Sequence, residues 1–122
     1  MKQVKIYLRS IEQDGQQRLS LFDTNRDGGF DDLVTEVEGG TTIIWALDKD
    51  SGISAVNSVE SKNPKGDFID FNPKKRIFCK GFKFCVPRVK EAGEIKYDIK
   101  YTPSGSKELL SIDPTIKIKP PN

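Results

Sequence analysis

Residues 93–101 read GEIKYDIKY, and this stretch indicates the fold class more clearly than any other part of the chain. Its apolar and aromatic side chains alternate with charged ones at Ile95, Tyr97, Ile99 and Tyr101. A period of two places successive side chains on opposite faces of a β-strand. The stretch therefore predicts a strand with one face in a core and the other in water.

The same period recurs along most of the chain, beginning with Val4, Ile6 and Leu8. Runs rich in β-branched and aromatic residues alternate with Gly, Pro, Asn and Asp, which favour turns. We expect further strands at residues 18–22, 33–37, 41–47, 53–59, 68–71, 77–79, 82–86 and 115–119. Many short strands at roughly ten-residue spacing favour a sandwich or barrel. We predict an all-β fold, a single antiparallel β-sandwich of Greek-key type.

The length of 122 residues fits one domain. We expect residues 1–122 to form it, with 1–119 as the core and 120–122 as a tail. No run resembles the roughly 20 apolar residues of a membrane span, so we expect no membrane contact. The first residues lack the apolar stretch of a signal peptide, which favours a cytoplasmic protein unless a leader has been removed.

Two segments resemble the cupredoxin family. Residues 37–45 read VEGGTTIIW and lead into the polar run 48–51, and residues 93–101 are similar to the penultimate cupredoxin strand. The resemblance implies a cupredoxin- or immunoglobulin-like sandwich. The copper ligands of the family are missing, because the first histidine is replaced within residues 53–56 and the cysteine would fall near Tyr101. The resemblance therefore does not imply copper chemistry.

The chain has no histidine and two cysteines, Cys79 and Cys85. The lack of histidine excludes a Ser–His–Asp or Cys–His nucleophile and a blue-copper site. Along one strand the two cysteines would lie roughly 20 Å apart, beyond disulfide range. We expect two reduced and mostly buried thiols, and we expect the chain not to be an enzyme.

The most specific motif is residues 23–32, which read DTNRDGGFDD. Oxygen-bearing side chains at loop positions 1, 3, 5 and 9, with glycine at 6, match the hard oxygen ligands that calcium prefers. The loop resembles the first half of an EF-hand loop, but it has Val34 at position 12 instead of glutamate. It is more similar to the calcium loops of FG-GAP repeats. We predict a structural calcium site whose ligands are Asp23, Asn25, Asp27, Gly29 and Asp31.

Both the loop and a basic segment allow other interpretations. Asn, Asp and Gly are common in any β-turn, so residues 23–32 could be a solvated loop without a metal. Residues 74–90 carry seven basic side chains, no acidic ones, and three phenylalanines. Such a segment can bind nucleic acid or another polyanion, although strand alternation would place Phe82 and Phe84 in the core. This alternative uses Lys74, Lys75, Arg76, Lys80 and Lys83.

The net charge of +2 is unevenly distributed. Residues 1–50 carry ten acidic and six basic side chains, whereas residues 51–122 carry eight acidic and fourteen basic ones. Such asymmetry can mark two surfaces of different character, or it can follow from which strands face solvent. We predict a non-catalytic binding module that carries calcium and binds another protein. Polyanion binding through residues 74–90 is the alternative.

Overall fold

The computed structural model describes residues 2–23, 28–29, 33–48, 50–76 and 80–121. These residues form eleven strands in two sheets. The first sheet has the order β3-β2-β1-β5-β8-β7. Its strands are β1 (Gln3–Gln13), β2 (Gln16–Asp23), β3 (Gly28–Gly29), β5 (Thr42–Leu47), β7 (Lys74–Lys75) and β8 (Phe82–Cys85).

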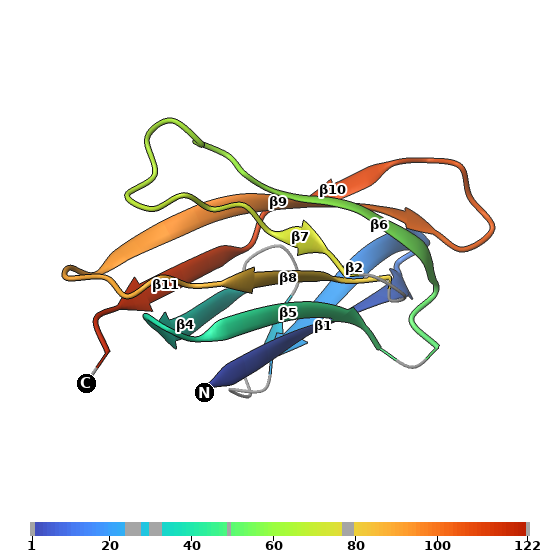
Figure 1. The fold of residues 1–122 in the computed structure, drawn as a ribbon. Coiled ribbons are helices and arrows are strands. Elements are labelled where there is room, and N and C mark those ends of the chain that lie inside the picture. The colour runs from blue at the N-terminus through green and yellow to red at the C-terminus, as the bar shows by residue number, and fades with distance from the viewer. Residues whose placement is uncertain (1, 24–27, 30–32, 49, 77–79, 122) are drawn as a thin grey trace.

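The second sheet has the order β10-β9-β11-β4, and β6 pairs with β9. Its strands are β4 (Val34–Glu38), β6 (Ile53–Ser61), β9 (Gly93–Pro103), β10 (Leu110–Ile112) and β11 (Thr115–Lys119). In Figure 1, β1, β5 and β8 lie side by side, with β6 and β9 above them. The two sheets pack as a sandwich, which confirms the predicted fold class.

Most strand pairs are antiparallel, but two are parallel. β1 pairs with β5, and β4 pairs with β11. The prediction was an antiparallel sandwich, and strands joined by short turns do run in opposite directions. The two parallel pairs join strands that are distant in the sequence, so no local turn sets their direction.

One hydrophobic cluster fills the space between the sheets. The alternating residues of β9 supply a row of fully buried side chains at Ile95, Tyr97, Ile99 and Tyr101. Trp45 lies at its centre, with its ring centroid 5.7 Å from that of Tyr97 and 6.1 Å from that of Phe71. The period of two therefore correctly predicts which face of these strands is buried.

Several predicted elements differ in the structure. Residues 68–71 form no strand, although Phe71 is buried and packs its ring on Phe84 at 4.9 Å. A segment can place one aromatic ring in a core without pairing its backbone. The short strands β3, β7 and β10 were not predicted. The predicted strand 77–79 and Cys79 lie outside the described residues.

The expectation of buried thiols was wrong for Cys85. Its side chain is exposed, because Phe84 and Val86 on either side of it point into the core. A tight turn at Asp14 and Gly15 joins β1 to β2. Both residues have positive φ, 53° and 78°, as the tight turn between antiparallel β1 and β2 requires.

No helix in the described ranges has the length and apolar character needed to cross a membrane.

Candidate functional site

The calcium motif begins at the end of β2, and the structure describes only part of it. Asn25, Asp27 and Asp31 lie outside the described residues. Gly29 pairs with Leu21 in the two-residue strand β3. Asp23 is 4% exposed, and its Oδ2 accepts a hydrogen bond of 2.7 Å from the hydroxyl of Thr35. The Asp23 carboxylate is thus engaged inside the sandwich.

This position gives Asp23 a structural role that the motif did not predict. A buried carboxylate needs hydrogen-bond donors, and Thr35, which is fully buried on β4, supplies one across the two sheets. Among the described side chains, no group of three or more Cys, Asp and Glu residues could hold a metal ion. Because most of the proposed ligands are not described, the calcium site stays a prediction.

The basic segment 74–90 does not form one surface. Phe82 and Phe84 are buried, as alternation predicts, so Lys83 points outward. Lys74 pairs with Lys83 across β7 and β8, and paired residues share a face. Lys75 pairs with Phe82 and therefore has the opposite orientation. Of the five residues in the alternative prediction, strand register places Lys74 and Lys83 on the outer face of the first sheet.

That outer face brings basic residues together from distant parts of the chain. Lys5 on β1 is in register with Ile44 on β5, Ile44 with Lys83, and Lys83 with Lys74. Neighbouring strands are about 4.8 Å apart, so the row spans roughly 14 Å. Ile44 is only 5% exposed, although it lies on the outer face. The lysines on both sides of it are placed to cover it with their aliphatic stems.

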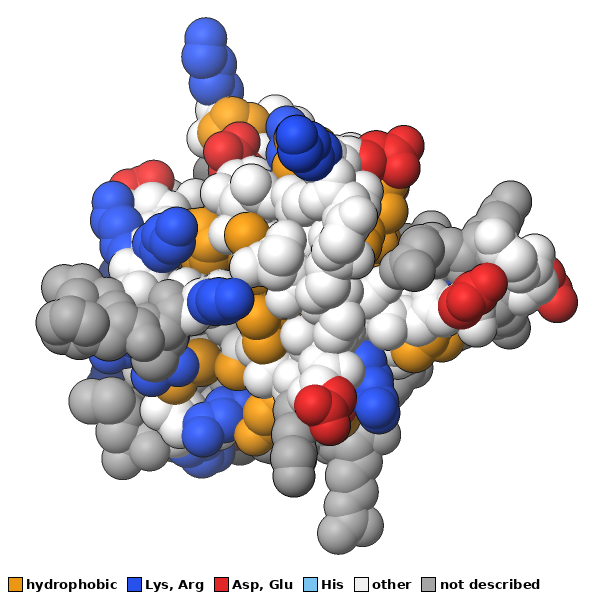
Figure 2. Space-filling model, turned by 90° about the vertical axis from the view of Figure 1, so that its right-hand side faces the viewer, with side chains coloured by type: hydrophobic (Ala, Val, Ile, Leu, Met, Phe, Trp, Pro, Cys, Tyr) orange, Lys and Arg blue, Asp and Glu red, His pale blue; other side chains and the backbone are white. Residues whose placement is uncertain are grey.

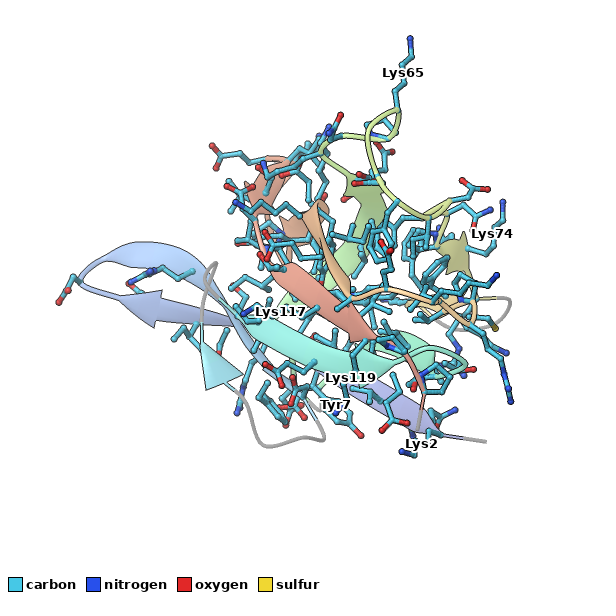
Figure 3. All side chains as sticks on the ribbon, turned by 90° about the vertical axis from the view of Figure 1, so that its left-hand side faces the viewer. Lys2, Tyr7, Lys65, Lys74, Lys117 and Lys119 are labelled. Carbon is cyan, nitrogen blue, oxygen red and sulfur yellow. The ribbon has the colours of Figure 1, made fainter. Side chains whose placement is uncertain are left out.

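A pair of aromatic rings occupies the next row of the same face. Tyr7 on β1 is in register with Phe22 on β2. Their rings stack with centroids 5.2 Å apart and an angle of 23° between the planes. Phe22 is 39% exposed, which is unusual for a phenylalanine. Figure 3 shows Tyr7 projecting from the bottom of the sandwich, with Lys74 beside β7 at the right.

We call this surface the basic face and define it by Lys5, Tyr7, Arg9, Arg18, Phe22, Ile44, Lys74 and Lys83. Arg9 and Arg18 have the strand parity of Tyr7 and Phe22, so they lie on the same side. None of the described strand residues on this side of the sheet is acidic. Asp48, just after β5, lies 4.0 Å from Arg9.

The charges in Figure 2 agree with this description. Lysine and arginine side chains, with apolar side chains between them, gather at the lower left. This is the side nearest the viewer in Figure 1, where β5, β7 and β8 lie. Acidic side chains lie mainly toward the right and the top of the view. The described strands thus contribute basic but no acidic side chains to the basic face, and Asp48 lies at its edge beside Arg9.

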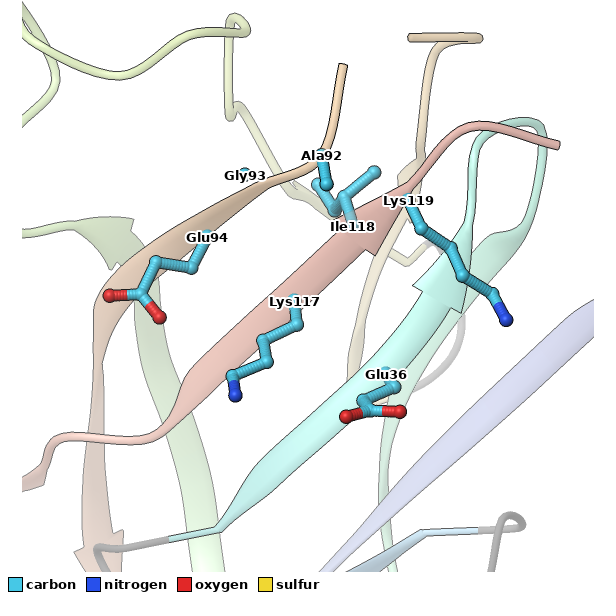
Figure 4. Close-up of a pocket in the computed structure, with 7 residues that line it drawn as sticks. All are labelled: Glu36, Ala92, Gly93, Glu94, Lys117, Ile118 and Lys119. Carbon is cyan, nitrogen blue, oxygen red and sulfur yellow. The ribbon is translucent and has the colours of Figure 1, made fainter. Parts of the chain in front are cut away.

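The outer face of the second sheet is different in character. Glu36, Lys117 and Glu94 lie in one register row across β4, β11 and β9. They border an open hollow of about 400 Å³ beside Ala92, Gly93 and Ile118, which Figure 4 shows in close-up. Acidic and basic side chains alternate here, so the hollow has no preference for a ligand of one charge.

No protein-family model matches the chain, and no curated protein matches its sequence. Sequence reasoning missed the basic face as a unit, because it joins β1, β2, β5, β7 and β8. Alternation alone indicates that Lys5, Tyr7 and Arg9 point away from the core, and that Lys83 does too. What the sequence does not show is that β5 lies between β1 and β8 and so brings these residues together.

Proposed function

We propose that this chain is a non-catalytic binding module whose basic face binds a polyanion, a chain of phosphate or sulfate groups. The observation that carries the proposal is the row of Lys5, Lys83 and Lys74, on a sheet surface to which the described strands contribute no acidic side chain. Cations fixed on a rigid sheet attract an extended anion and lose little conformational freedom when it binds.

The basic face is not the same surface as the segment 74–90 that the sequence indicated. Residues 74–90 contribute Lys74 and Lys83, whereas Lys5, Arg9 and Arg18 come from the N-terminal half, which is acidic overall. A binding surface is determined by which side chains share a face, and net charge along the sequence does not report this. The predicted protein partner and calcium ion are separate proposals, tested below for calcium.

The test is a titration with a fluorescent heparin fragment at increasing salt. Wild-type affinity is expected to fall steeply between about 50 and 200 mM salt, because binding releases counterions. The double variant Lys74→Gln/Lys83→Gln should bind about tenfold more weakly and show a shallower salt dependence. The matched control is Lys96→Gln/Lys100→Gln, which removes two exposed lysines from the second sheet.

The control variant should retain wild-type affinity to within about twofold. If the two double variants lose equal affinity, the attraction comes from total charge and the basic face is not the site. If the wild-type chain does not bind heparin even at low salt, the proposed function is wrong.

A further inference from the structure

The basic face carries an exposed phenylalanine, Phe22, stacked on the half-buried Tyr7. Binding of a polyanion through its charges alone does not require aromatic rings. We propose that its ligand is single-stranded nucleic acid, with Phe22 and Tyr7 stacking against the bases and the lysines contacting the phosphates. This inference rests on the proposed function and names its ligand. The base–aromatic contact is largely independent of sequence, because every base has a π face.

The position of the Phe22–Tyr7 pair supports stacking. On the far side of Phe22 its register partner is Gly28, and on the far side of Tyr7 it is Ala46. Neither residue has a side chain larger than a methyl group. Among the described residues of this row, no bulky side chain therefore stands next to either ring, and Phe22 is 39% exposed.

Cations lie on both sides of the ring pair along the strand. Lys5, Tyr7 and Arg9 follow each other at two-residue spacing on one face of β1. Consecutive members are therefore roughly 7 Å apart. A nucleotide places a negative phosphate next to a flat base, so a surface with cation, ring and cation in succession is complementary to a nucleotide chain.

A single strand fits this surface better than a duplex. In a duplex the bases are stacked on each other, so their faces are not available to protein rings. In a single strand the bases can be splayed out and stacked on aromatic side chains. The rings are thus expected to distinguish a single strand from both a duplex and a sulfated sugar, whereas the lysine row attracts all three.

The experiment compares four probes with the same wild-type chain at one salt concentration. They are a fluorescein-labelled oligothymidylate of about 12 nucleotides, an abasic oligomer of the same length, a duplex of the same length, and the heparin fragment. The oligothymidylate should bind at least about fivefold more tightly than the abasic oligomer, which has the same phosphates but no bases. The duplex should also bind more weakly than the oligothymidylate.

The Phe22→Leu variant removes the ring and keeps an apolar side chain. It should lower the ratio of oligothymidylate affinity to heparin affinity by about fivefold or more. The matched control is Phe68→Leu, because Phe68 is 45% exposed and packs beside Gly93 in the second sheet. That control should bind every probe as the wild type does.

The outcomes separate this inference from the proposed function. If oligothymidylate and the abasic oligomer bind wild-type chain equally well, the rings do not contact bases and the inference is wrong, while heparin binding still supports the polyanion proposal. If Phe22→Leu weakens heparin and oligothymidylate equally, the ring supports the face structurally and the inference is again wrong. If none of the probes binds, the proposed function itself fails.

Discussion

At the scale of single residues, two buried polar pairs connect strands across the sandwich. The indole Nε1 of Trp45 donates a 3.1 Å hydrogen bond to the Tyr97 hydroxyl, and Thr35 donates to Asp23. Burial raises the pKa of Tyr97 above its ordinary value of 10.0, and the nearby negative charge of Asp23 adds to this. A buried hydroxyl that is costly to ionise makes stability depend on pH in the alkaline range.

Replacing Tyr97 tests this dependence. Tyr97→Phe leaves the Trp45 Nε1–H without its acceptor, and it should lower the free energy of unfolding at pH 7 by about 1–3 kcal/mol. The folded pKa of Tyr97 lies above the unfolded one. The contribution of Tyr97 to the free energy of unfolding is thus complete below about pH 10. At higher pH this contribution declines, by at most about 1.4 kcal/mol per pH unit.

Phenylalanine has no hydroxyl to ionise, so position 97 of the variant causes no decline in stability at high pH. The difference in free energy of unfolding between the variant and the wild type should therefore narrow above pH 10. Urea unfolding at pH 7 and at several values above pH 9, followed by tryptophan fluorescence, measures it. The wild-type decline will not vanish in the variant, because burial also raises the pKa of Tyr101. A stability difference that stays constant over the whole range would mean that Tyr97 ionises equally in both states.

At the scale of elements, two features stand out: the close approach of β8 to β5, and the acidic connection from β2 to β4. β8 lies so near β5 that a side chain at Gly81 would collide with the carbonyl oxygen of Trp45. Glycine at position 81 therefore permits the close pairing of β5 with β8 in which Lys83 is in register with Ile44. The connection from β2 to β4 contains the calcium motif, whose four aspartates, Asp23, Asp27, Asp31 and Asp32, would repel one another without a cation.

The calcium prediction is tested through this connection. If calcium binds only the folded chain, an excess of about a hundredfold over Kd should raise the melting temperature by about 5–10 °C. Asp27→Asn should abolish most of that gain and leave the metal-free protein as stable or slightly more stable. The control Glu91→Gln removes an exposed charge elsewhere and should keep the gain.

Melting curves in millimolar calcium and in excess chelator provide the measurement. Identical curves for the wild-type chain would disprove the calcium site. If Asp27→Asn instead destabilises the metal-free protein by more than about 1 kcal/mol, Asp27 holds the turn through its own hydrogen bonds. The loop would then be a polar turn, the alternative that the sequence allows.

At the scale of the whole molecule, one core joins the two sheets. Phe71 lies in the connection between β6 and β7 and packs on Trp45, Phe84 and Tyr97, which come from both sheets. Trp45 belongs to the first sheet and Tyr97 to the second, and they share a hydrogen bond. If one sheet unfolded, the apolar inner face of the other sheet would be exposed to water.

We therefore expect a single cooperative unfolding transition. Tryptophan fluorescence reports the core around Trp45, whereas far-ultraviolet circular dichroism reports all strands. The two signals should give the same urea midpoint, as two-state unfolding requires. Phe71→Leu should lower that midpoint in both signals together, because it loosens the contact between the sheets. Two separate midpoints, in the wild type or the variant, would show that the sheets unfold independently.

The sequence by itself determined the local structure. Alternation in residues 93–101 correctly identified a strand and its buried side, and the same reasoning placed Phe82 and Phe84 in the core. It works because the side-chain period of a strand is a local property of the backbone. It failed for residues 68–71, which bury the ring of Phe71 without forming a strand. The expectation of a buried thiol at Cys85 did not use alternation, which places Cys85 on the outer face with Lys83.

Only the tertiary structure decided which strands are neighbours, and with that the candidate site. The order β1-β5-β8-β7 brings Lys5 into one row with Lys83 and Lys74, although about 70 residues separate them along the chain. The packing of the two sheets also places Asp23 of β2 beside Thr35 of β4. Strand pairing between distant segments depends on the packing of the whole core, because loop closure costs little extra for longer loops and local periodicity carries no information about partners.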